Sequence, residues 1–227
     1  MSLKENLTTL QSQIRAASKL KGNGREVKLI AVTKTRTVQT IKDAYRCGIK
    51  SIGENRVQEA DSKFETFKEM PGLEKRFIGH LQSNKIKKCL LMFDTIDSIH
   101  SLRLARKINN HLIQEKMEIK ALLEINMSGD EQKNGFSPDN KEEIISSLSL
   151  SCLKVEGLMT VGPASRDKQE TRKAFEGLRK LKDELNKEMG KESLTELSMG
   201  MSGDFELGIE EGSTMVRVGT ALFGKRN

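Results

Sequence analysis

The amino-acid sequence predicts a (β/α)8 barrel that forms a single domain over residues 1–227. Eight short strand-like runs alternate with helical patterns along the chain. Several runs are almost continuously apolar, which is typical of parallel strands buried on both faces. No linker rich in Gly, Ser or Pro marks a second domain. An open, doubly wound sheet is the alternative arrangement of the same elements.

A helix is expected before the first strand. Ser2 and Glu5 have the spacing of a capping box, and the apolar residues that follow recur at helical intervals: Leu3, Leu7, Leu10 and Ile14. No long helical pattern follows the eighth strand. We therefore expect this additional N-terminal helix to take the place of the missing last helix of the barrel.

The eight strands are predicted from their short apolar or β-branched runs, at residues 29–33, 50–53, 76–79, 92–96, 121–126, 155–160, 194–198 and 214–218. Helical spacing of apolar residues predicts helices over 98–113 and 168–188. Ser137 followed by Pro138 predicts a further helix start, with Ser as the cap and Pro in the first turn.

Composition excludes several classes of protein. No apolar run approaches the roughly 18 residues that a membrane span needs, and the polar N-terminus does not resemble a secretory signal. Three cysteines without C-x-x-C spacing argue against a disulfide framework and a zinc site. These features predict a cytoplasmic protein with reduced cysteines and no bound metal.

The net charge of +7 is uneven, with 24 basic against 13 acidic residues in 1–120 and 15 against 19 in 121–227. The basic residues are dispersed, and no stacking aromatic residues lie among them. A solvated basic face is therefore expected rather than a nucleic-acid site, although such a field would favour an anionic ligand.

Three segments indicate one ligand site. Lys34 closes the first strand run, Ser202 and Gly203 are expected to open a short helix after the seventh strand, and Gly219 and Thr220 close the eighth. A lysine amine can form a Schiff base with an aldehyde, and Ser-Gly and Gly-Thr segments can hold a phosphate. In a barrel these positions meet at the carboxyl ends of the strands. Pyridoxal 5'-phosphate (PLP) carries both an aldehyde and a phosphate.

Arg217 alternates with valines in the last strand, so its side chain is expected to point towards the barrel mouth. One interpretation is a structural ion pair with a carboxylate. The other is a hydrogen bond to the pyridine nitrogen of the cofactor, which would have to stay an unprotonated acceptor because arginine only donates.

Three more residues lie at predicted strand ends or within strands. Asn55 follows the second strand and His80 the third, and both are candidate cofactor contacts. For His80, a hydrogen-bonded loop histidine is an equal alternative; His100 and His111 are expected on helices without a chemical role. Glu124 lies in an otherwise apolar strand and needs a partner or a polar interior.

The sequence resembles the pyridoxal phosphate homeostasis protein family over nearly the whole chain. The segments that carry the resemblance are AVTKT (31–35), GEN (53–55), FIGHLQSNK (77–85), SGDEQKNGF (128–136), GLMT (157–160), LSMGMSGD (197–204) and GSTMVRVGT (212–220).

This resemblance implies a barrel related to the N-terminal domain of alanine racemase, with PLP on Lys34. It carries the phosphate role over to Ser202, Gly219 and Thr220, and the ring-nitrogen role to Arg217. It implies a protein that binds PLP without an established reaction, with PLP-dependent apoenzymes as candidate recipients. Loss of the racemase dimerisation domain implies a monomer. No role is assigned to the 128–136 segment.

Two enzymatic alternatives remain at this point. A small PLP-dependent racemase would need a second proton acceptor opposite Lys34, yet the only tyrosine, Tyr45, is expected on the first barrel helix, away from the mouth. A Schiff-base aldolase acting on a phosphorylated sugar would use the same barrel and phosphate site. Hydrolase and nucleotide-binding motifs are absent from the sequence; residues 200–204 only approach G-x-S-x-G.

Overall fold

Eight parallel strands form a closed ring in sequence order, as seen in a computed structural model that describes residues 2–20, 26–130, 132–165 and 167–224. The first strand pairs with the second and with the eighth, which closes the barrel and excludes the open sheet. The strands are β1 (Lys28–Val32), β2 (Ser51–Glu54), β3 (Glu74–Phe77), β4 (Thr95–Ile99), β5 (Ile119–Glu124), β6 (Leu153–Met159), β7 (Glu196–Met201) and β8 (Met215–Val218).

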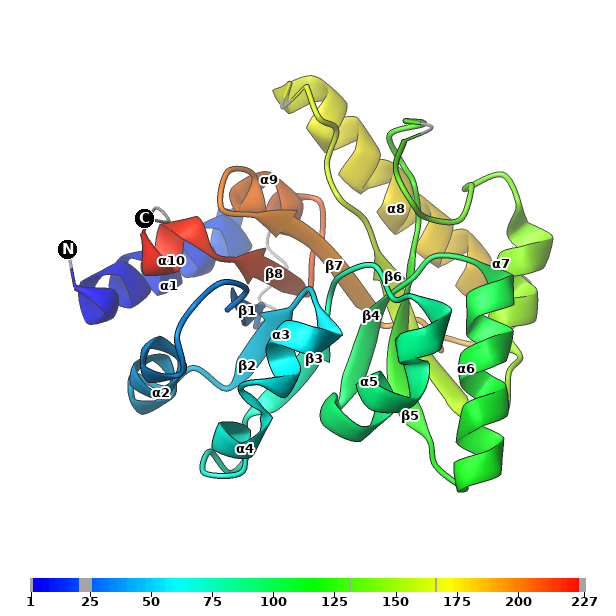
Figure 1. Cartoon of the computed structure of the whole chain (residues 1–227). Coiled ribbons are helices and arrows are strands. Elements are labelled where there is room, and N and C mark those ends of the chain that lie inside the picture. The colour runs from blue at the N-terminus through cyan, green and yellow to red at the C-terminus, as the bar shows by residue number, and fades with distance from the viewer. Residues whose placement is uncertain (1, 21–25, 131, 166, 225–227) are drawn as a thin grey trace.

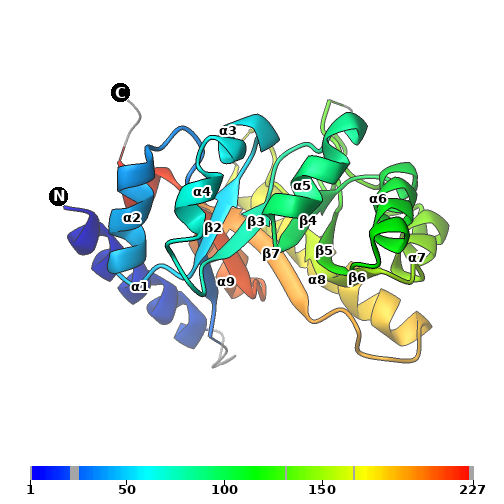
Figure 2. The ribbon, with the colours of Figure 1, turned by 60° about the horizontal axis from the view of Figure 1, so that its bottom comes forward.

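Helices surround this ring on its outer side (Figures 1 and 2). They are α1 (Leu3–Leu20), α2 (Val38–Arg46), α3 (Val57–Asp61), α4 (Phe64–Phe67), α5 (Ile86–Met92), α6 (Leu102–Glu115), α7 (Lys141–Leu148), α8 (Lys168–Glu188), α9 (Phe205–Glu210) and α10 (Thr220–Phe223), with a 3-10 turn η1 at Ser83–Lys85. None of the described helices combines the length and apolar character needed to cross a bilayer.

The N-terminal helix confirms the expected substitution for a last barrel helix. Its capping box is present, with Ser2 N–H donating to Glu5 at 2.8 Å and Glu5 N–H donating to Ser2 Oγ at 3.3 Å. The apolar face of α1 joins the core cluster that contains Phe205 of α9 and Leu222 of α10. Asn6 Nδ2 donates to Leu222 O at 3.0 Å, so helix α1 lies beside the last described turn of the chain, as Figure 1 shows.

Two sequence predictions placed elements wrongly. The fourth strand was predicted at 92–96 but runs from Thr95 to Ile99, because the apolar residues before it end helix α5. The strand itself is partly polar, since Asp97 and Ser98 are buried with hydrogen-bond partners. β4 is shifted by three residues at both ends, whereas every other strand begins within two residues of its predicted start.

The predicted helix start at Ser137 and Pro138 is also wrong. Asn140 N–H donates to Ser137 O at 3.1 Å, which closes a turn. Helix α7 begins after that turn, and the Asn140 side chain accepts the N–H of Glu143 at its first turn. The predicted helix over 98–113 starts later, at Leu102, with Ser101 as its cap, whereas the helix over 168–188 is confirmed.

Two apolar layers define which way each side chain points. Alternate residues of the strands pack outward against the helices, as Val216 and Val218 of β8 do. A small cluster fills the inside of the ring: Ile30, Leu122, Met159 and Met215. The interior also holds charge, because Arg76 of β3 donates to both carboxylate oxygens of Asp97 at 2.7 and 2.9 Å. The barrel interior is therefore partly polar.

Candidate functional site at the barrel mouth

Lys34 lies just beyond β1, at the end of the barrel where the strands finish. Ile30 of this strand points into the ring, and the alternation of side chains puts Val32 and Lys34 on the same inner side. Arg36 N–H donates to Thr33 O at 3.0 Å and closes a tight turn around Lys34. The lysine side chain is half-buried at the mouth.

The segments after β7 and β8 meet at one hydroxyl group. Ser202 Oγ accepts the backbone N–H of Gly219 at 3.3 Å and of Ala221 at 3.2 Å. A Cβ added at Gly219 would lie 3.5 Å from the side chain and from the carbonyl oxygen of Val32, so this junction adjoins strand β1 two residues before Lys34. Two N–H groups thus point at one position on the rim next to Val32, where an oxyanion can replace the hydroxyl oxygen of Ser202 as their acceptor.

The predicted helix start at Ser202 and Gly203 is wrong. Ser202 and Gly203 do not open the short helix; they lie in the preceding turn, and α9 begins at Phe205. The side chain of Asp204 accepts the N–H of Met201 at 2.5 Å and closes this turn. Thr220 is the first residue of α10 and is exposed, so its hydroxyl is accessible from solvent.

Arg217 is buried inside the barrel and makes no ion pair among the described residues. Its Nη1 donates to Ser198 O at 2.8 Å and to Ser198 Oγ at 2.6 Å, and its Nη2 donates to Thr160 O at 2.9 Å. Burial lowers the pKa of Arg217, although nearby carboxylates oppose that shift. These bonds use three of the five guanidinium N–H donors, so the others can still serve a ligand.

Glu124 finds a polar interior rather than an ion-pair partner. It follows Leu122, which belongs to the interior cluster, and lines a cavity of about 240 Å³ together with Asn126 and Lys133. Burial raises the pKa of Glu124 to about 7, while the charge of Arg217 acts in the opposite direction. The carboxyl group can therefore hold or release a proton near neutral pH.

Asn55 and His80 line a second cavity of about 520 Å³, next to the mouth. Asn55 Oδ1 is buried without a hydrogen-bond partner, which leaves an acceptor for a ligand. A Cβ added at Gly79 would lie 2.1 Å from Asn55 O, so only glycine allows these two loops to approach. His80 is exposed, and its ring stacks on His100 with 4.5 Å between centroids. No contact joins His80 to Lys34 or Arg217 in the described part of the chain.

The expectation that His100 lies on a helix is wrong. It follows β4 directly, before the cap of α6, and its Nδ1 is buried without a partner. Burial and the neighbouring His80 lower the pKa of His100. His111 lies on α6, as predicted. Two histidines after successive strands were a signal that could have placed the pair together.

Sequence reasoning missed a buried charge network on the outer side of β1 and β2. Lys63 Nζ lies 2.9 Å from Glu54 Oε1 and 2.6 Å from Glu59 Oε1, and it donates to Thr33 O at 3.1 Å. Thr33 Oγ1 donates to Glu54 Oε1 at 2.7 Å. A glutamate at the end of an apolar strand was the available signal, because a buried carboxylate needs a partner.

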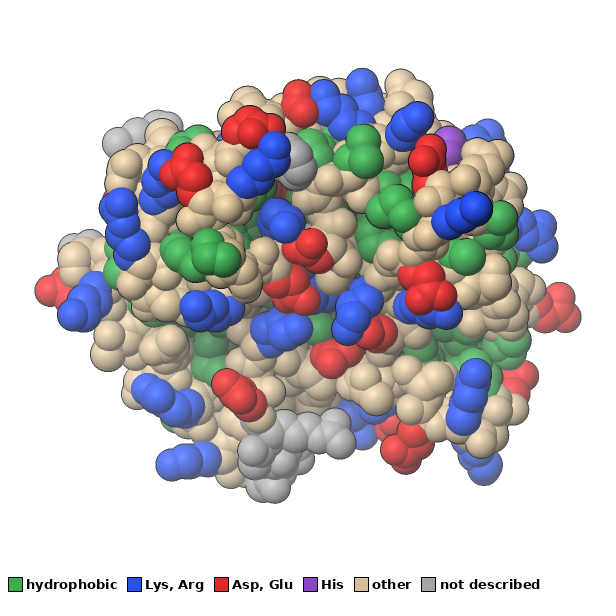
Figure 3. Space-filling view, turned by 90° about the horizontal axis from the view of Figure 1, so that it is seen from below, with side chains coloured by type: hydrophobic (Ala, Val, Ile, Leu, Met, Phe, Trp, Pro, Cys, Tyr) green, Lys and Arg blue, Asp and Glu red, His purple; other side chains and the backbone are tan. Residues whose placement is uncertain are grey.

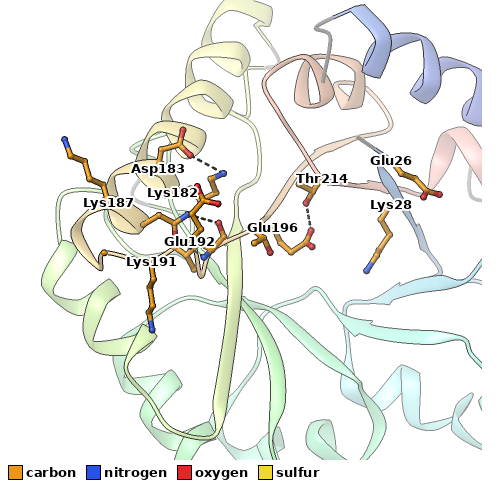
Figure 4. A pocket seen from close by; sticks show the side chains of 13 residues that line it. Glu26, Lys28, Lys182, Asp183, Lys187, Lys191, Glu192, Glu196 and Thr214 are labelled. Atoms are coloured by element: carbon orange, nitrogen blue, oxygen red, sulfur yellow. Dashed lines mark hydrogen bonds and ion pairs between the residues drawn. The ribbon is translucent and has the colours of Figure 1, made fainter. Parts of the chain in front are cut away.

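A cavity of about 1000 Å³ lies at the opposite end of the barrel, where the strands begin. Figure 3 views that end and shows basic and acidic side chains interspersed. The cavity is drawn in Figure 4, and Lys182 pairs with Asp183 at 3.1 Å in its wall. Four lysines and four carboxylates line it: Lys28, Lys182, Lys187, Lys191, Glu26, Asp183, Glu192 and Glu196. The formal charges of this lining sum to zero, so the cavity carries no signal for a particular ligand.

Comparison with known proteins shows the family of this chain. The model of the alanine racemase N-terminal domain family matches residues 5–227. A pyridoxal phosphate homeostasis protein of Aquifex aeolicus is 40% identical over 228 residues, covering 100% of this chain and 99% of that protein.

Solved structures of related proteins show the same fold as this chain. PipY of Synechococcus elongatus, solved with PLP bound, has a TM-score of 0.87 at 34% identity and covers 98% of this chain and 100% of its own. Alanine racemase of Clostridium difficile, at 19% identity, shares the fold over 99% of this chain and 56% of its own, with a TM-score of 0.77. The chain therefore belongs to the alanine racemase N-terminal domain family, and within it to the pyridoxal phosphate homeostasis proteins.

Proposed function

We propose that this protein binds PLP in the barrel mouth, holds it on Lys34 as a Schiff base, and serves intracellular PLP homeostasis. The observation that carries the proposal is the junction of the segments after β7 and β8 beside Lys34. There, Ser202 Oγ and the N–H groups of Gly219 and Ala221 converge at 3.2–3.3 Å. An amine and an oxyanion site on one rim match the aldehyde and the phosphate of PLP.

Each predicted residue has a proposed task in this site. Ser202, Gly219 and Thr220 would bind the phosphate, and Arg217 would donate to the pyridine nitrogen through a remaining guanidinium N–H. Asn55 would satisfy its buried Oδ1, which has no partner in the protein, with a donor of the ligand. His80 is the weakest member, because its ring stacks on His100 beside the neighbouring cavity.

When bound, PLP supplies an aldehyde and an electron-withdrawing ring. The chain's own residues limit how that ring can be used. Arginine has no proton acceptor and keeps its proton, so a nitrogen that it faces stays unprotonated and withdraws fewer electrons. This favours holding the cofactor over carbanion chemistry, and we propose a carrier without a racemase reaction.

The position of Tyr45 supports the same choice. Its hydroxyl donates to Pro71 O at 2.8 Å, in the segment that leads into β3, so it lies at the end of the barrel opposite Lys34. It cannot take a proton on the second face of a substrate held at the mouth. A racemase would introduce solvent deuterium at the α-carbon of amino acids; we expect no exchange at a useful turnover.

We further propose that the protein acts as a monomer in the cytoplasm and passes PLP to apoenzymes. The cysteines Cys47, Cys89 and Cys152 are free, which suits a reducing compartment. Sedimentation of the purified protein tests the first point. Reconstitution of an apoenzyme under conditions where free PLP is scavenged tests the last, since transfer through solution would then fail.

The first experiment is an absorbance spectrum of the purified protein with added PLP, followed by borohydride reduction and peptide mass mapping. We expect a yellow protein with the reduced adduct on Lys34, and no adduct in a folded Lys34→Ala variant. An adduct on another lysine would show that PLP is linked at a different residue and would contradict the assignment to Lys34. Trapping of a keto-sugar phosphate in place of PLP would instead support a Schiff-base aldolase.

The phosphate assignment has its own test in Thr220→Ala. Loss of one hydrogen bond to a charged group should weaken PLP affinity by about 1–2 kcal/mol. The matched control is Thr8→Ala, which removes a hydroxyl that donates to Lys4 O on the exposed side of helix α1 and should leave affinity unaltered. Equal affinity of wild-type protein and Thr220→Ala would remove Thr220 from the phosphate site.

A further inference from the structure

Thr35, the residue after Lys34, has an unfavourable backbone conformation. Its φ is 61°, in the left-handed region, where β-branched residues are genuine outliers. Apart from Thr35, only Lys116 shares this feature among the described non-glycine residues, and Lys116 caps the end of helix α6. Such a conformation persists only where surrounding contacts fix it.

The contacts that fix this turn come from helix α3 and the residues that follow it. Glu59 of α3 accepts the N–H of Thr35. Lys63 donates to Thr33 O at 3.1 Å and pairs with Glu59 at 2.6 Å. One carboxylate and one ammonium therefore hold the backbone on both sides of Lys34.

Burial makes this attachment rigid. The Lys63 side chain is 6% exposed and that of Glu54, its second partner, is fully buried. An unpaired ammonium would be costly at such a site, so Lys63 has little freedom to leave its three acceptors. Water has little access to Lys63 and Glu54, whereas the bond between the Thr35 N–H and Glu59 lies at the surface, where the Glu59 side chain is 23% exposed.

The network cannot touch a ligand in the mouth. Thr33 and Glu54 alternate with Lys34 and Asn55 along their strands, so their side chains point to the outer side of the barrel wall. Glu59 and Lys63 can influence the mouth only through the backbone of residues 33–36.

We propose that Glu59 and Lys63 are positioning residues for Lys34. They hold Thr35 in the left-handed conformation, and this turn presents the Lys34 amine to the mouth. The inference rests on the proposed function in so far as it concerns the reaction of Lys34 with PLP. The state of the turn itself can be measured without PLP.

The first measurement is hydrogen exchange of the Thr35 amide in cofactor-free protein. Glu59→Ala should raise its exchange rate about tenfold, since it removes a hydrogen bond to a charged acceptor. The matched control is Glu176→Ala, which breaks an i,i+4 pair with Lys180 on helix α8 and leaves the turn intact. Unchanged exchange of Thr35 in folded Glu59→Ala would overturn the proposal.

The second measurement is the rate at which added PLP becomes linked to Lys34, stopped with borohydride and counted on the Lys34 peptide. Glu59→Ala should react about tenfold more slowly, because the amine leaves its oriented position. The double variant Thr35→Gly/Glu59→Ala should recover most of the rate, since glycine adopts positive φ without support. A double variant as slow as Glu59→Ala would overturn the proposed route through the turn.

Two further comparisons keep the outcomes distinct. If wild-type protein does not link PLP at Lys34, the proposed function fails, while amide exchange still decides the role of Glu59 in the turn. Should Glu59→Ala fold poorly, Glu59→Gln keeps an acceptor for Thr35 but loses the ion pair with Lys63. It should fall between wild-type and Ala values in exchange rate; a wild-type value would contradict a role for the ion pair.

Discussion

Two buried charge networks in this barrel differ in what they hold. Inside the ring, Arg76 of β3 binds both oxygens of Asp97 on β4, and Thr95 also donates to Asp97 at 2.9 Å. On the outer side of the barrel wall, the Lys63 ammonium group donates to Glu54, to Glu59 and to the carbonyl oxygen of Thr33.

The two networks differ in whether every carboxylate oxygen has a donor and in whether the network contacts the backbone. Each oxygen of Asp97 has a donor, and the contacts join one strand to the next. Glu54 has a buried Oε2 without a partner, and burial raises its pKa against the influence of Lys63. The complete side-chain pair ties two strands together, whereas the incomplete network extends to the backbone on both sides of Lys34.

The largest effect is expected from Asp97→Asn. The new amide nitrogen would face a guanidinium N–H, so a buried donor would lose its acceptor at a cost of about 3–5 kcal/mol. Urea unfolding measures this loss. The folded fraction should still link PLP at the wild-type rate; a slower linkage would break the distinction between the two networks.

Glu124 extends the comparison to a partly buried carboxyl group without an ion pair among the described residues. Burial raises its pKa from an ordinary value of 4.5 to about 7 in the folded protein. The stability that this group contributes is therefore fully present below pH 4.5 and lost as the pH rises through about 7.

The side chain of a Glu124→Gln variant cannot ionise. Its folding stability should therefore not decrease as the pH rises through about 7. The variant should gain on the order of 3 kcal/mol relative to wild type between these two pH values. Urea unfolding of both proteins at several pH values measures the difference. A difference that does not depend on pH would place the Glu124 carboxyl group in contact with water.

A smaller effect is expected from Glu54→Gln. The amide carbonyl can still accept from Thr33 and Lys63, and the amide nitrogen can take the place of Oε2, where no donor lies. The loss should be about 1–2 kcal/mol, well below that of Asp97→Asn. Equal losses in the two variants would mean that the networks are equivalent.

The smallest effect is expected from Thr35→Gly alone. It removes a left-handed strain of about 1–2 kcal/mol but adds about 0.5–1 kcal/mol of backbone entropy to the unfolded state. The free energy of unfolding should change by less than about 1 kcal/mol, measured in urea. A loss beyond about 2 kcal/mol would show that the Thr35 side chain itself stabilises the fold.

Much of this architecture was accessible from the sequence. Apolar runs and helical spacing predict the closed barrel, the N-terminal helix and the helix over 168–188, because these patterns report burial directly. They failed at β4, where Asp97 and Ser98 are buried through hydrogen bonds that no apolar pattern records. They failed at Ser137, where local cap chemistry forms a turn instead.

The candidate site also contains residues that could be predicted from the sequence and contacts that could not. Lys34, Ser202, Gly219 and Thr220 could be placed at one rim because parallel strands of a barrel end together. The contacts of Lys63 could not be found, since its partners are brought together by the packing of α3 and α4 on β1 and β2 rather than by spacing. The stacking of His80 on His100 likewise depends on loop geometry.

The packing of α1 has a consequence for how the protein is made. This helix is synthesised before every strand, yet its apolar face packs on α9 and α10, and Asn6 bonds Leu222 across 216 residues. Contacts of such long sequence separation form late, because the intervening chain must be ordered first. The ring therefore cannot close until β8 has been synthesised, and before that the apolar face of α1 lacks the helices that cover it.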